Sequence, residues 1–483
     1  MAPITLPFSK GLVTTNRDVD WLDALPLNMI AVPKEVLGHP GYMHSWPGLA
    51  QNMDVAGLAR GAVNNEDQRT VFRTHGTSLI SQAGEVLADV GGVGYAAMPF
   101  SSGRQAIVSG NNLNYWNGTS LTQLQNWTAD EHASGDPATD FDIGEVLDAV
   151  FVNGRYSWIK RGSGEFGSTD IENPERPSYQ APFVSAEAGF DRNVGIGVWK
   201  TSVVIFGRNT IEFFAPTGAV EPVYRAQRAY TIQAGIVGVA AKTVFQDNFA
   251  IVGSPKDKPP SVYLVGQGVY REIATRFVQE LIRSYSDADL ELTILETIKF
   301  DNHDLLLVHL PDMTLVYDAG SSNETTQRWS ILSSSTTGLG FYRGIYHIFS
   351  NGGWTVGDRT ASIISDLRFD IASHVGLNPL FELFTPMVQI RNQNLHNLQL
   401  DNIPGYQNEG YNIAYAMTRD GEVYSQDSWI SASNPLDRTT RILARKLGYS
   451  RNNVGFRLRW ITGAPSSVSK FQISAGQLDG PNG

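Results

Sequence analysis

The sequence contains no cysteine, and no window approaches the roughly 18 uninterrupted apolar residues that a membrane-spanning helix needs. The first absence excludes disulfides, thiolate metal sites and thiol nucleophiles, so packing and association must stabilise the fold. The first residues also lack a basic segment followed by a long apolar stretch. We therefore expect a soluble product that is neither secreted nor embedded in a membrane.

Positive charge is also scarce. Lys and Arg number 37 against 48 Asp and Glu, which gives a net charge of -11. This balance argues against a protein that grips nucleic acid, because Lys and Arg supply most non-specific affinity for phosphates. The cations are unevenly placed, with eight basic residues and one acidic residue between Asp437 and Ala475. This segment is a candidate docking face for an acidic partner or for another copy of the chain; the alternative is that its cations lie on solvated strand faces.

What the sequence has in quantity is β-hairpins. Seven times between Thr70 and Asp358, a run of β-forming apolar residues is followed by a turn and a second alternating run. One hairpin cannot bury its apolar face alone, so repeated hairpins must stack or close into a ring. The turns, roughly 35 to 55 residues apart, are typical of four-stranded blades. The turns lie at Gly76, Gly110-Asn111, Asn153-Gly154, Gly207-Arg208-Asn209, Pro255 to Pro260, Pro311-Asp312 and Asn351-Gly352-Gly353.

The sequence is therefore mainly β, and it predicts a β-propeller of seven blades, or of six if the first and last repeats share one blade. Jelly rolls and sandwiches also use hairpins, but their strands usually recur every 8 to 12 residues without the longer period.

We predict three parts. Residues 1–50 form a proline-rich arm that either crosses to a neighbour or adds a strand to the last blade. Residues 51–375 form the propeller, with a helical insertion at about 271–298 that comprises helices near Arg271 to Ser284 and Asp287 to Thr297. Residues 376–483 form a C-terminal β-sandwich docking domain, with alternating runs at 413–417, 442–447, 455–461 and 468–473.

No motif forms a convincing catalytic or cofactor site. Gly162 to Gly167 satisfies a dinucleotide-binding pattern, but Pro174 and Pro177 follow where that pattern needs a helix. The nine histidines are scattered, and His303 and His309 flank a strand as ordinary core or surface residues would. Thr418 to Tyr424 resembles one incomplete aspartate box of a sialidase, which a hairpin turn explains better. We expect a protein that is not an enzyme and has no catalytic residues, no cofactor and no metal.

Specific segments resemble one family, the packaged-DNA stabilisation proteins of Salmonella-type short-tailed bacteriophages (podoviruses), which form the tail hub or nozzle. The resemblance runs in order through about residues 20–375 and weakens in the C-terminal sandwich. The segments that carry it are 25–35 (LPLNMIAVPKE), 41–48 (GYMHSWPG), 195–200 (GIGVWK), 206–214 (FGRNTIEFF), 260–263 (PSVY), 282–286 (IRSYS), 300–311 (FDNHDLLLVHLP) and 315–318 (LVYD).

The resemblance implies a structural virion protein that forms a homo-hexamer below the portal and its adaptor ring. Such a ring closes the portal channel after DNA packaging, carries tailspikes or fibres and a tail needle, and conducts DNA during ejection without binding it specifically. It implies location in the virion tail, after assembly in the host cytoplasm. The acidic balance suits a conduit whose wall must not retain DNA.

Aromatic and arginine side chains are typical anchors of protein interfaces. Our candidate interface residues are Trp46, Trp429, Arg438, Arg441, Arg445 and Lys446. Two other functions remain open from the residues alone: a propeller that binds or degrades host surface carbohydrate, and a propeller scaffold in a cellular complex. Which spike or fibre docks on the protein is also open.

Overall fold

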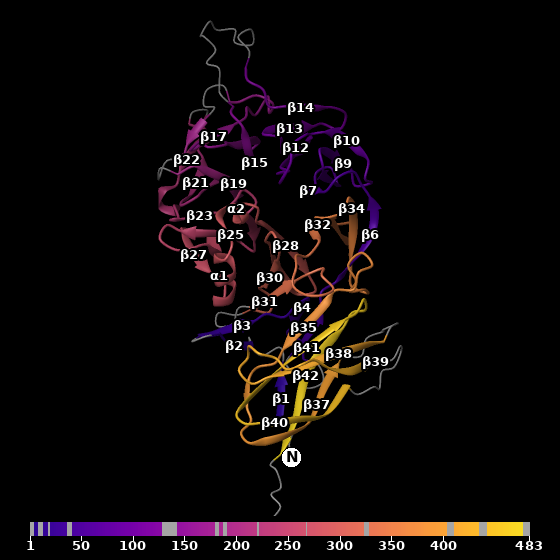
Figure 1. Cartoon of the computed structure of the whole chain (residues 1–483). Coiled ribbons are helices and arrows are strands. Elements are labelled where there is room, and N and C mark those ends of the chain that lie inside the picture. Colours follow the sequence, from indigo (N-terminus) through magenta and orange to yellow (C-terminus); the bar gives the residue numbers. More distant parts are fainter. Residues whose placement is uncertain are drawn as a thin grey trace, which may run out of the picture.

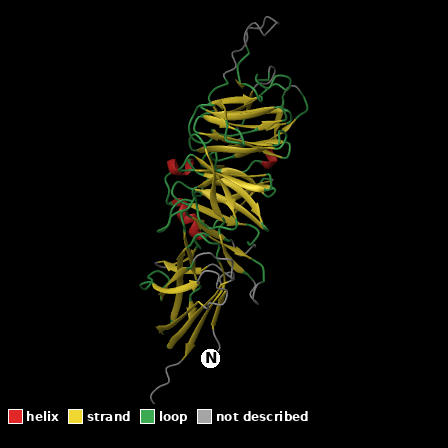
Figure 2. Ribbon diagram, turned by 90° about the vertical axis from the view of Figure 1, so that its right-hand side faces the viewer, coloured by secondary structure: helices red, strands yellow, loops and turns green. Residues whose placement is uncertain are grey.

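A computed structural model shows a ring of seven β-sheets joined to a β-sandwich (Figures 1 and 2). The structure describes residues 4–7, 13–17, 20–35, 41–127, 143–178, 183–186, 191–219, 222–266, 268–322, 328–402, 410–433 and 442–476. Within these residues, no helix has the length and apolar character needed to cross a membrane.

The ring is a seven-bladed propeller, and each blade is an antiparallel sheet of four strands or, in blade 5, five. Blades 1 to 4 are built from β7 (Ala59–Asn65), β8 (Thr70–His75), β9 (Ser78–Ile80) and β10 (Val86–Asp89); β11 (Phe100–Ser101), β12 (Arg104–Ser109), β13 (Asn112–Trp116) and β14 (Leu121–Gln123); β15 (Val146–Val152), β16 (Arg155–Lys160), β17 (Glu165–Ser168) and β18 (Phe183–Ser185); and β19 (Asn193–Trp199), β20 (Ser202–Gly207), β21 (Ile211–Pro216) and β22 (Tyr224–Ala226).

Blades 5 to 7 continue the ring. They are built from β23 (Ala234–Ile236), β24 (Lys242–Phe245), β25 (Asn248–Pro255), β26 (Ser261–Gly266) and β27 (Val269–Glu272); β28 (Ile294–Phe300), β29 (His303–His309), β30 (Thr314–Asp318) and β31 (Trp329–Leu332); and β32 (Gly344–Ser350), β33 (Gly353–Asp358), β34 (Ile363–Arg368) and β6 (Gly48–Asp54). A short 3-10 helix, η3 (Arg228–Tyr230), precedes blade 5.

The ring closes through the N-terminal part of the chain. β6 pairs antiparallel with β34, so a strand that precedes blade 1 in the sequence is the outer strand of blade 7. This is one of the two roles predicted for the proline-rich arm. On the inner side, β32 of blade 7 contacts β7 of blade 1, which joins the first and last blades.

All seven predicted hairpins are present, one in each blade, so the prediction from the repeated turns is confirmed. The turn between β15 and β16 shows why Asn and Gly occur at such turns. Asn153 (φ 54°) and Gly154 (φ 77°) both adopt the left-handed conformation that a two-residue hairpin turn requires. Asn and Gly tolerate that conformation better than other residues.

The middle strands of the blades are apolar on both faces because neighbouring blades cover them. All residues of β20 and of β26 are buried, so these strands do not alternate between apolar and polar residues. Fully buried strands pack blade against blade, and the resulting clusters of apolar residues run from one blade into the next.

The sandwich consists of two antiparallel sheets with alternating buried and exposed residues, as in β38 and β42. The first sheet is ordered β4-β5-β42-β37-β40, and β1 pairs with β42; the second is ordered β35-β41-β38-β39, and β36 pairs with β41. Their strands are β1 (Ile4–Pro7), β4 (Met29–Val32), β5 (Tyr42–Ser45), β37 (Gln393–Asn402), β40 (Ile442–Ser450) and β42 (Ser467–Gly476); and β35 (Leu380–Phe384), β36 (Val388–Gln389), β38 (Tyr411–Thr418), β39 (Ser428–Ser433) and β41 (Asn453–Ile461). β2 (Val13–Arg17) and β3 (Asp20–Ala24) form a separate hairpin.

The N-terminal segment belongs to the sandwich as well as to the propeller. Strands β4 and β5 lie within residues 1–50, which we predicted as an arm, yet they are part of the first sandwich sheet. Asn28, just before β4, is fully buried between the two parts. Its side-chain amide donates to the carbonyl of Ser333 in the propeller part at 2.9 Å and to that of Leu380 in the sandwich at 2.8 Å.

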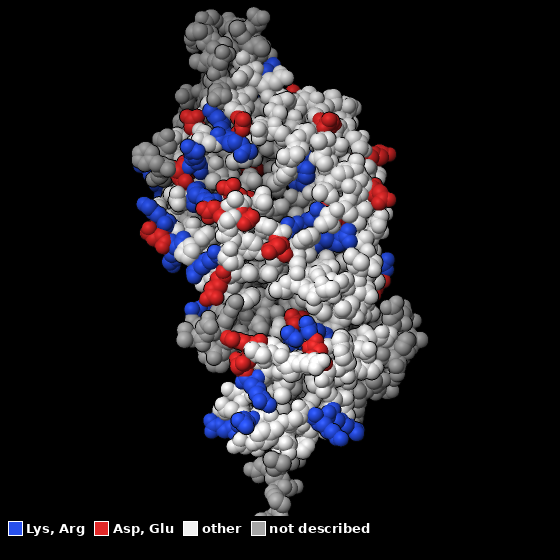
Figure 3. Space-filling model, in the orientation of Figure 1, with Lys and Arg blue, Asp and Glu red and all other residues white. Residues whose placement is uncertain are grey.

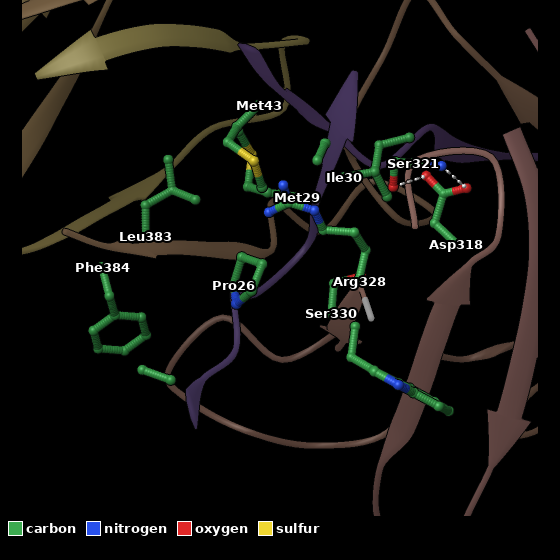
Figure 4. A pocket seen from close by; sticks show the side chains of 13 residues that line it. Pro26, Met29, Ile30, Met43, Asp318, Ser321, Arg328, Ser330, Leu383 and Phe384 are labelled. Atoms are coloured by element: carbon green, nitrogen blue, oxygen red, sulfur yellow. Dashed lines mark hydrogen bonds between the residues drawn. The ribbon is translucent and has the colours of Figure 1, made fainter. Parts of the chain in front are cut away.

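A small cavity of about 50 Å³ lies beside this junction (Figure 4). Pro26 and Met29 from the N-terminal segment line it together with Leu383 of the sandwich and Asp318 of blade 6. The Asp318 carboxylate accepts hydrogen bonds from the hydroxyl and the backbone N–H of Ser321. The N-terminal segment therefore lies between propeller and sandwich and leaves only this small cavity beside it.

The helical insertion is shorter than predicted. α1 (Arg276–Arg283) and α2 (Asp287–Glu291) lie between blades 5 and 6, and Ser286 caps α2 as expected by accepting from the Asp289 N–H. The expectation that the second helix continues to Thr297 is wrong, because residues 294–300 form β28 and pair along their whole length with β29. β-branched Ile294, Thr297 and Ile298 favour the strand.

Candidate functional site

Glu296 is the centre of a buried polar cluster near the propeller axis. Its carboxylate accepts a hydrogen bond from His347 Nδ1 at 2.9 Å and lies 2.7 Å from His309 Nε2. Burial favours the protonated acid, but the two imidazoles hold the pKa of Glu296 well below its usual value, while burial lowers the pKa of His309. The cluster joins β28 and β29 of blade 6 to β32 of blade 7. His309 is thus a core residue, as predicted.

A second polar group joins three blades at the inner edge of the ring. Asp148 on β15 lies 2.7 Å from Lys242 Nζ on β24, and its carboxylate also accepts from the Ile196 N–H on β19 at 3.1 Å. These inner strands line a cavity of about 550 Å³. Among the described residues, no group of three or more His, Asp and Glu is arranged to hold a metal ion. The carboxylates of Glu296 and Asp148 are engaged with neighbouring side chains and with the backbone.

The two motifs that resemble functional signatures are turns. Gly162 (φ 74°) lies between β16 and β17, and the pattern that begins there ends in strand β17, not in a helix. In the 418–424 segment, Asp420 Oδ1 accepts the backbone N–H groups of Glu422 and Val423, each at 2.9 Å. These hydrogen bonds lower the pKa of Asp420. The dinucleotide site is therefore excluded at this position, and the hairpin-turn interpretation of 418–424 is confirmed.

Trp46, one of the predicted interface residues, is a core residue. Its side chain has no exposed surface, and its ring packs edge-on against Phe300 at 5.8 Å and Tyr342 at 6.0 Å. It lies where the chain passes from the sandwich to β6. Because the side chain is fully buried, Trp46 presents no surface to another subunit in this structure.

Trp429 is on the surface, with 68% of its area exposed on β39, an edge strand of the second sandwich sheet. It borders a groove of about 520 Å³ between the sandwich and the propeller. Ile461 of β41 and Thr337, which follows blade 6, also line the groove. The groove is about ten times larger than the small cavity beside Pro26 and Met29.

Charged side chains cover the outer face of this same sheet. Asp427 lies 3.3 Å from Arg457 and also pairs with Arg459, and Arg457 is 3.6 Å from Glu382. Arg457 also lies over the ring of Tyr424, 4.6 Å from its centroid. Lys470 of β42 pairs with Asp401 at 2.9 Å, so three of the eight cations of the basic segment are neutralised within the sandwich.

Arg445 and Lys446 are exposed on β40, the edge strand of the first sandwich sheet. Side chains normally alternate between faces along a strand, yet these two neighbours both reach solvent. A bulge explains this, because the pairing register with β37 shifts at Leu395/Asn397 and Lys446 has a φ of 58°. Predicted interface residues Arg438 and Arg441 lie outside the described residues.

Sequence reasoning missed Asn28 and the bulge at Lys446. The signal for Asn28 is weak, since Asn tolerates positive φ in any loop. The bulge has no signal in the sequence, because Lys is not a residue that favours a left-handed backbone.

The fold and these surfaces define a two-part β protein, a propeller joined to a sandwich, whose polar clusters hold blades together and whose sandwich edge carries exposed cations. Comparison with known proteins then identifies its family. A family model described as bacteriophage P22 Gp10, beta-propeller, matches residues 4–372, and one described as bacteriophage P22 Gp10, beta-sandwich, matches residues 380–476. The chain belongs to the phage P22 Gp10 family.

One relative is the tail hub protein gp10 of Salmonella phage P22, which is 35% identical over 474 residues, covering 97% of this chain and 98% of that protein. Two solved structures with a similar fold are far less similar in sequence. PorZ, a surface component of the type-IX secretion system of Porphyromonas gingivalis, has 9% identity and a TM-score of 0.37, covering 79% of this chain and 46% of that one. The Pan2 WD40 domain of Neurospora crassa has 8% identity and a TM-score of 0.38, covering 67% and 95%. Scores at this level carry no argument about function.

Proposed function

We propose that this chain is the tail hub of a short-tailed phage, a structural virion protein. The observation that carries the proposal is the identity of 35% with the P22 tail hub protein across nearly the whole length of both chains. Both the propeller and the sandwich take part in the match. The proposal therefore covers both parts of the chain, the propeller and the sandwich.

We further propose that six copies form a ring below the portal and its adaptor, which closes the channel after packaging, carries spikes or fibres and a needle, and later conducts DNA. The architecture supports a role of this kind, because buried polar groups join neighbouring blades and make the propeller rigid. The acidic balance of the chain, with a net charge of -11, disfavours retention of a polyanion.

The test is assembly with purified components. The full chain is mixed with the portal-adaptor complex of the same phage, and the products are weighed by native mass spectrometry and imaged by cryo-electron microscopy. We expect six copies bound to each complex. Failure to join the complex, combined with normal amounts of the chain in infected cells but none in virions, would refute the hub function.

A further inference from the structure

One edge of the sandwich carries cations that have no acidic partner among the described residues. We call Arg391, Arg445, Lys446 and Arg451 the cationic strip; all four are exposed. The ion pairs of the sandwich, within the part of the chain that the structure describes, involve Arg457, Arg459 and Lys470 and none of the strip. In Figure 3 the end of the sandwich far from the propeller shows blue side chains and no red ones on the visible face.

The backbone is strained in order to build the strip. Ile442 and Ala444 of β40 point into the core, and the bulge then turns both Arg445 and Lys446 outward. A lysine in the left-handed conformation costs roughly 1–2 kcal/mol relative to an ordinary strand conformation. Strain of this kind persists where a side chain must be aimed in a particular direction, and here it aims two adjacent positive charges at solvent.

The chemistry of the strip favours an acidic protein surface over a membrane or nucleic acid. Arg451 lies six residues beyond Arg445, so the strip extends about 20 Å at roughly 3.3 Å per residue. No exposed large apolar residue lies on β40, which leaves no wedge to insert into a bilayer. The one aromatic ring of the strand, that of Tyr449, is half-buried, and its hydroxyl donates to Asn392 Oδ1 at 3.0 Å. The net charge of -11 opposes duplex DNA, which carries about one negative charge per 1.7 Å of its axis, more strongly than a protein surface with scattered acidic groups.

The partner is not the strip of another copy. If the copies form a ring, as the proposed hub function requires, equivalent strips lie at the same level and repel each other. A different protein with an acidic surface would contact several strips at once, and repeated weak charge contacts then add to a firm attachment. We propose that the cationic strip is the docking surface for an acidic protein component of the tail.

The test compares two charge-reversal variants of the full chain. In the strip variant, R445E/K446E, two exposed cations on β40 are reversed. In the control variant, K256E/K258E, the same change of charge is made on the exposed hairpin between β25 and β26 of blade 5. The affinities of each chain for the purified adaptor, spike and needle proteins of the same phage are measured at low and at physiological salt, and R445Q/K446Q is measured as a milder strip variant.

We expect the strip variant to bind one acidic component at least about tenfold more weakly, with a reduced salt dependence, and the control to stay within about twofold of the natural chain. Unchanged binding of all three components would overturn the proposal. It would also be overturned if the strip variant lost only its binding to duplex DNA or to phosphatidylglycerol vesicles. A strip variant that only aggregated on size exclusion would overturn it too, because the cations would then serve to keep the edge strand β40 from pairing with other chains. If the natural chain bound none of the components, the hub function itself would fail, and with it this inference.

Discussion

Asn28 shows how a single side chain holds together distant parts of this protein. Its amide donates to Ser333 and Leu380, and its side-chain oxygen accepts from the Ser333 N–H at 2.9 Å. Its own carbonyl accepts from the Trp46 N–H at 2.8 Å. Buried groups that satisfy each other in this way leave no spare partner if one of them is removed.

We predict that Asn28→Ala lowers the free energy of unfolding by about 3–5 kcal/mol, because three buried backbone groups lose their partner and alanine disfavours a φ of 56°. Urea unfolding followed by tryptophan fluorescence measures the change. Asn52→Ala is the control, since Asn52 donates to Asp366 on the exposed surface, and a change below about 0.5 kcal/mol is expected there. Equal effects of the two substitutions would contradict the clamping role.

His374 makes the stability depend on pH. Burial, helped by nearby Arg343, lowers the pKa of His374 to about 3. The buried imidazole, hydrogen-bonded to Ser334 at 2.9 Å, must stay neutral in the fold but gains a proton near pH 6.5 when unfolded. The stability it contributes is therefore complete above about pH 6.5 and is lost as the pH falls towards its folded pKa.

Between pH 6.5 and pH 5, we expect the natural chain to lose about 1.5–2 kcal/mol more stability than His374→Gln, which cannot titrate. The free energy of unfolding of both chains is measured at the two pH values. If the free energy of unfolding fell by the same amount in both chains, the pKa of His374 would not be lowered in the folded protein.

At the scale of elements, arginines join the blades by donating to backbone carbonyls and hydroxyls; Arg60 and Arg73 are buried, and Arg208 and Arg359 are half-buried. A guanidinium suits this task because it presents several fixed donors and stays charged. These hydrogen bonds fasten neighbouring blades to each other, whereas the hairpin repeat alone only places the blades side by side. The pairs are Arg60 with Ser109, Arg73 with Tyr346 and Thr355, Arg208 with Val237, and Arg359 with Leu310.

Arg73 joins the first blade to the last, and burial lowers its pKa to about 10. We predict that Arg73→Ala costs about 3–4 kcal/mol, because it leaves a cavity and two unsatisfied carbonyls at the place where the ring closes. Arg161→Ala, which removes an exposed pair with Glu145, should cost about 0.5 kcal/mol or less. Hydrogen exchange adds a local measurement: protection should fall in β7 and β32 first. A loss of protection spread evenly over all blades would contradict a role at the closure.

Much of the architecture follows from local patterns in the sequence. The seven hairpins and four strands of the sandwich, β38, β40, β41 and β42, were predictable because turn residues and alternation act over a few residues. The end of the second helix was not predictable, because residues 294–300 become a strand by pairing with β29. The burial of Trp46 and the cation-exposing bulge at Lys446 depend on contacts with residues hundreds of positions away or on a neighbouring strand, and no local pattern reports them.

At the scale of the whole molecule, propeller and sandwich share one segment of chain. Residues 29–32 and 42–45 pair within the sandwich, and β6 follows at once in blade 7. The two parts cannot separate without disturbing the strand that closes the ring. The sandwich is therefore not a domain attached by a free linker.

Calorimetry tests this coupling. We expect the natural chain to unfold in a single transition, because loss of the sandwich releases the segment that holds blade 7. Asn28→Ala should lower that transition temperature and leave it single. Two transitions more than about 10 °C apart in the natural chain would show that the parts unfold independently.

The strand that closes the ring also sets an order of events during synthesis. β6 leaves the ribosome before any blade is made, but its partner β34 follows only after some three hundred further residues. Until then the nascent chain carries an unpaired strand, which invites pairing with other chains. The last blade is thus completed only near the end of translation, and a chain truncated before β34 cannot become a finished propeller.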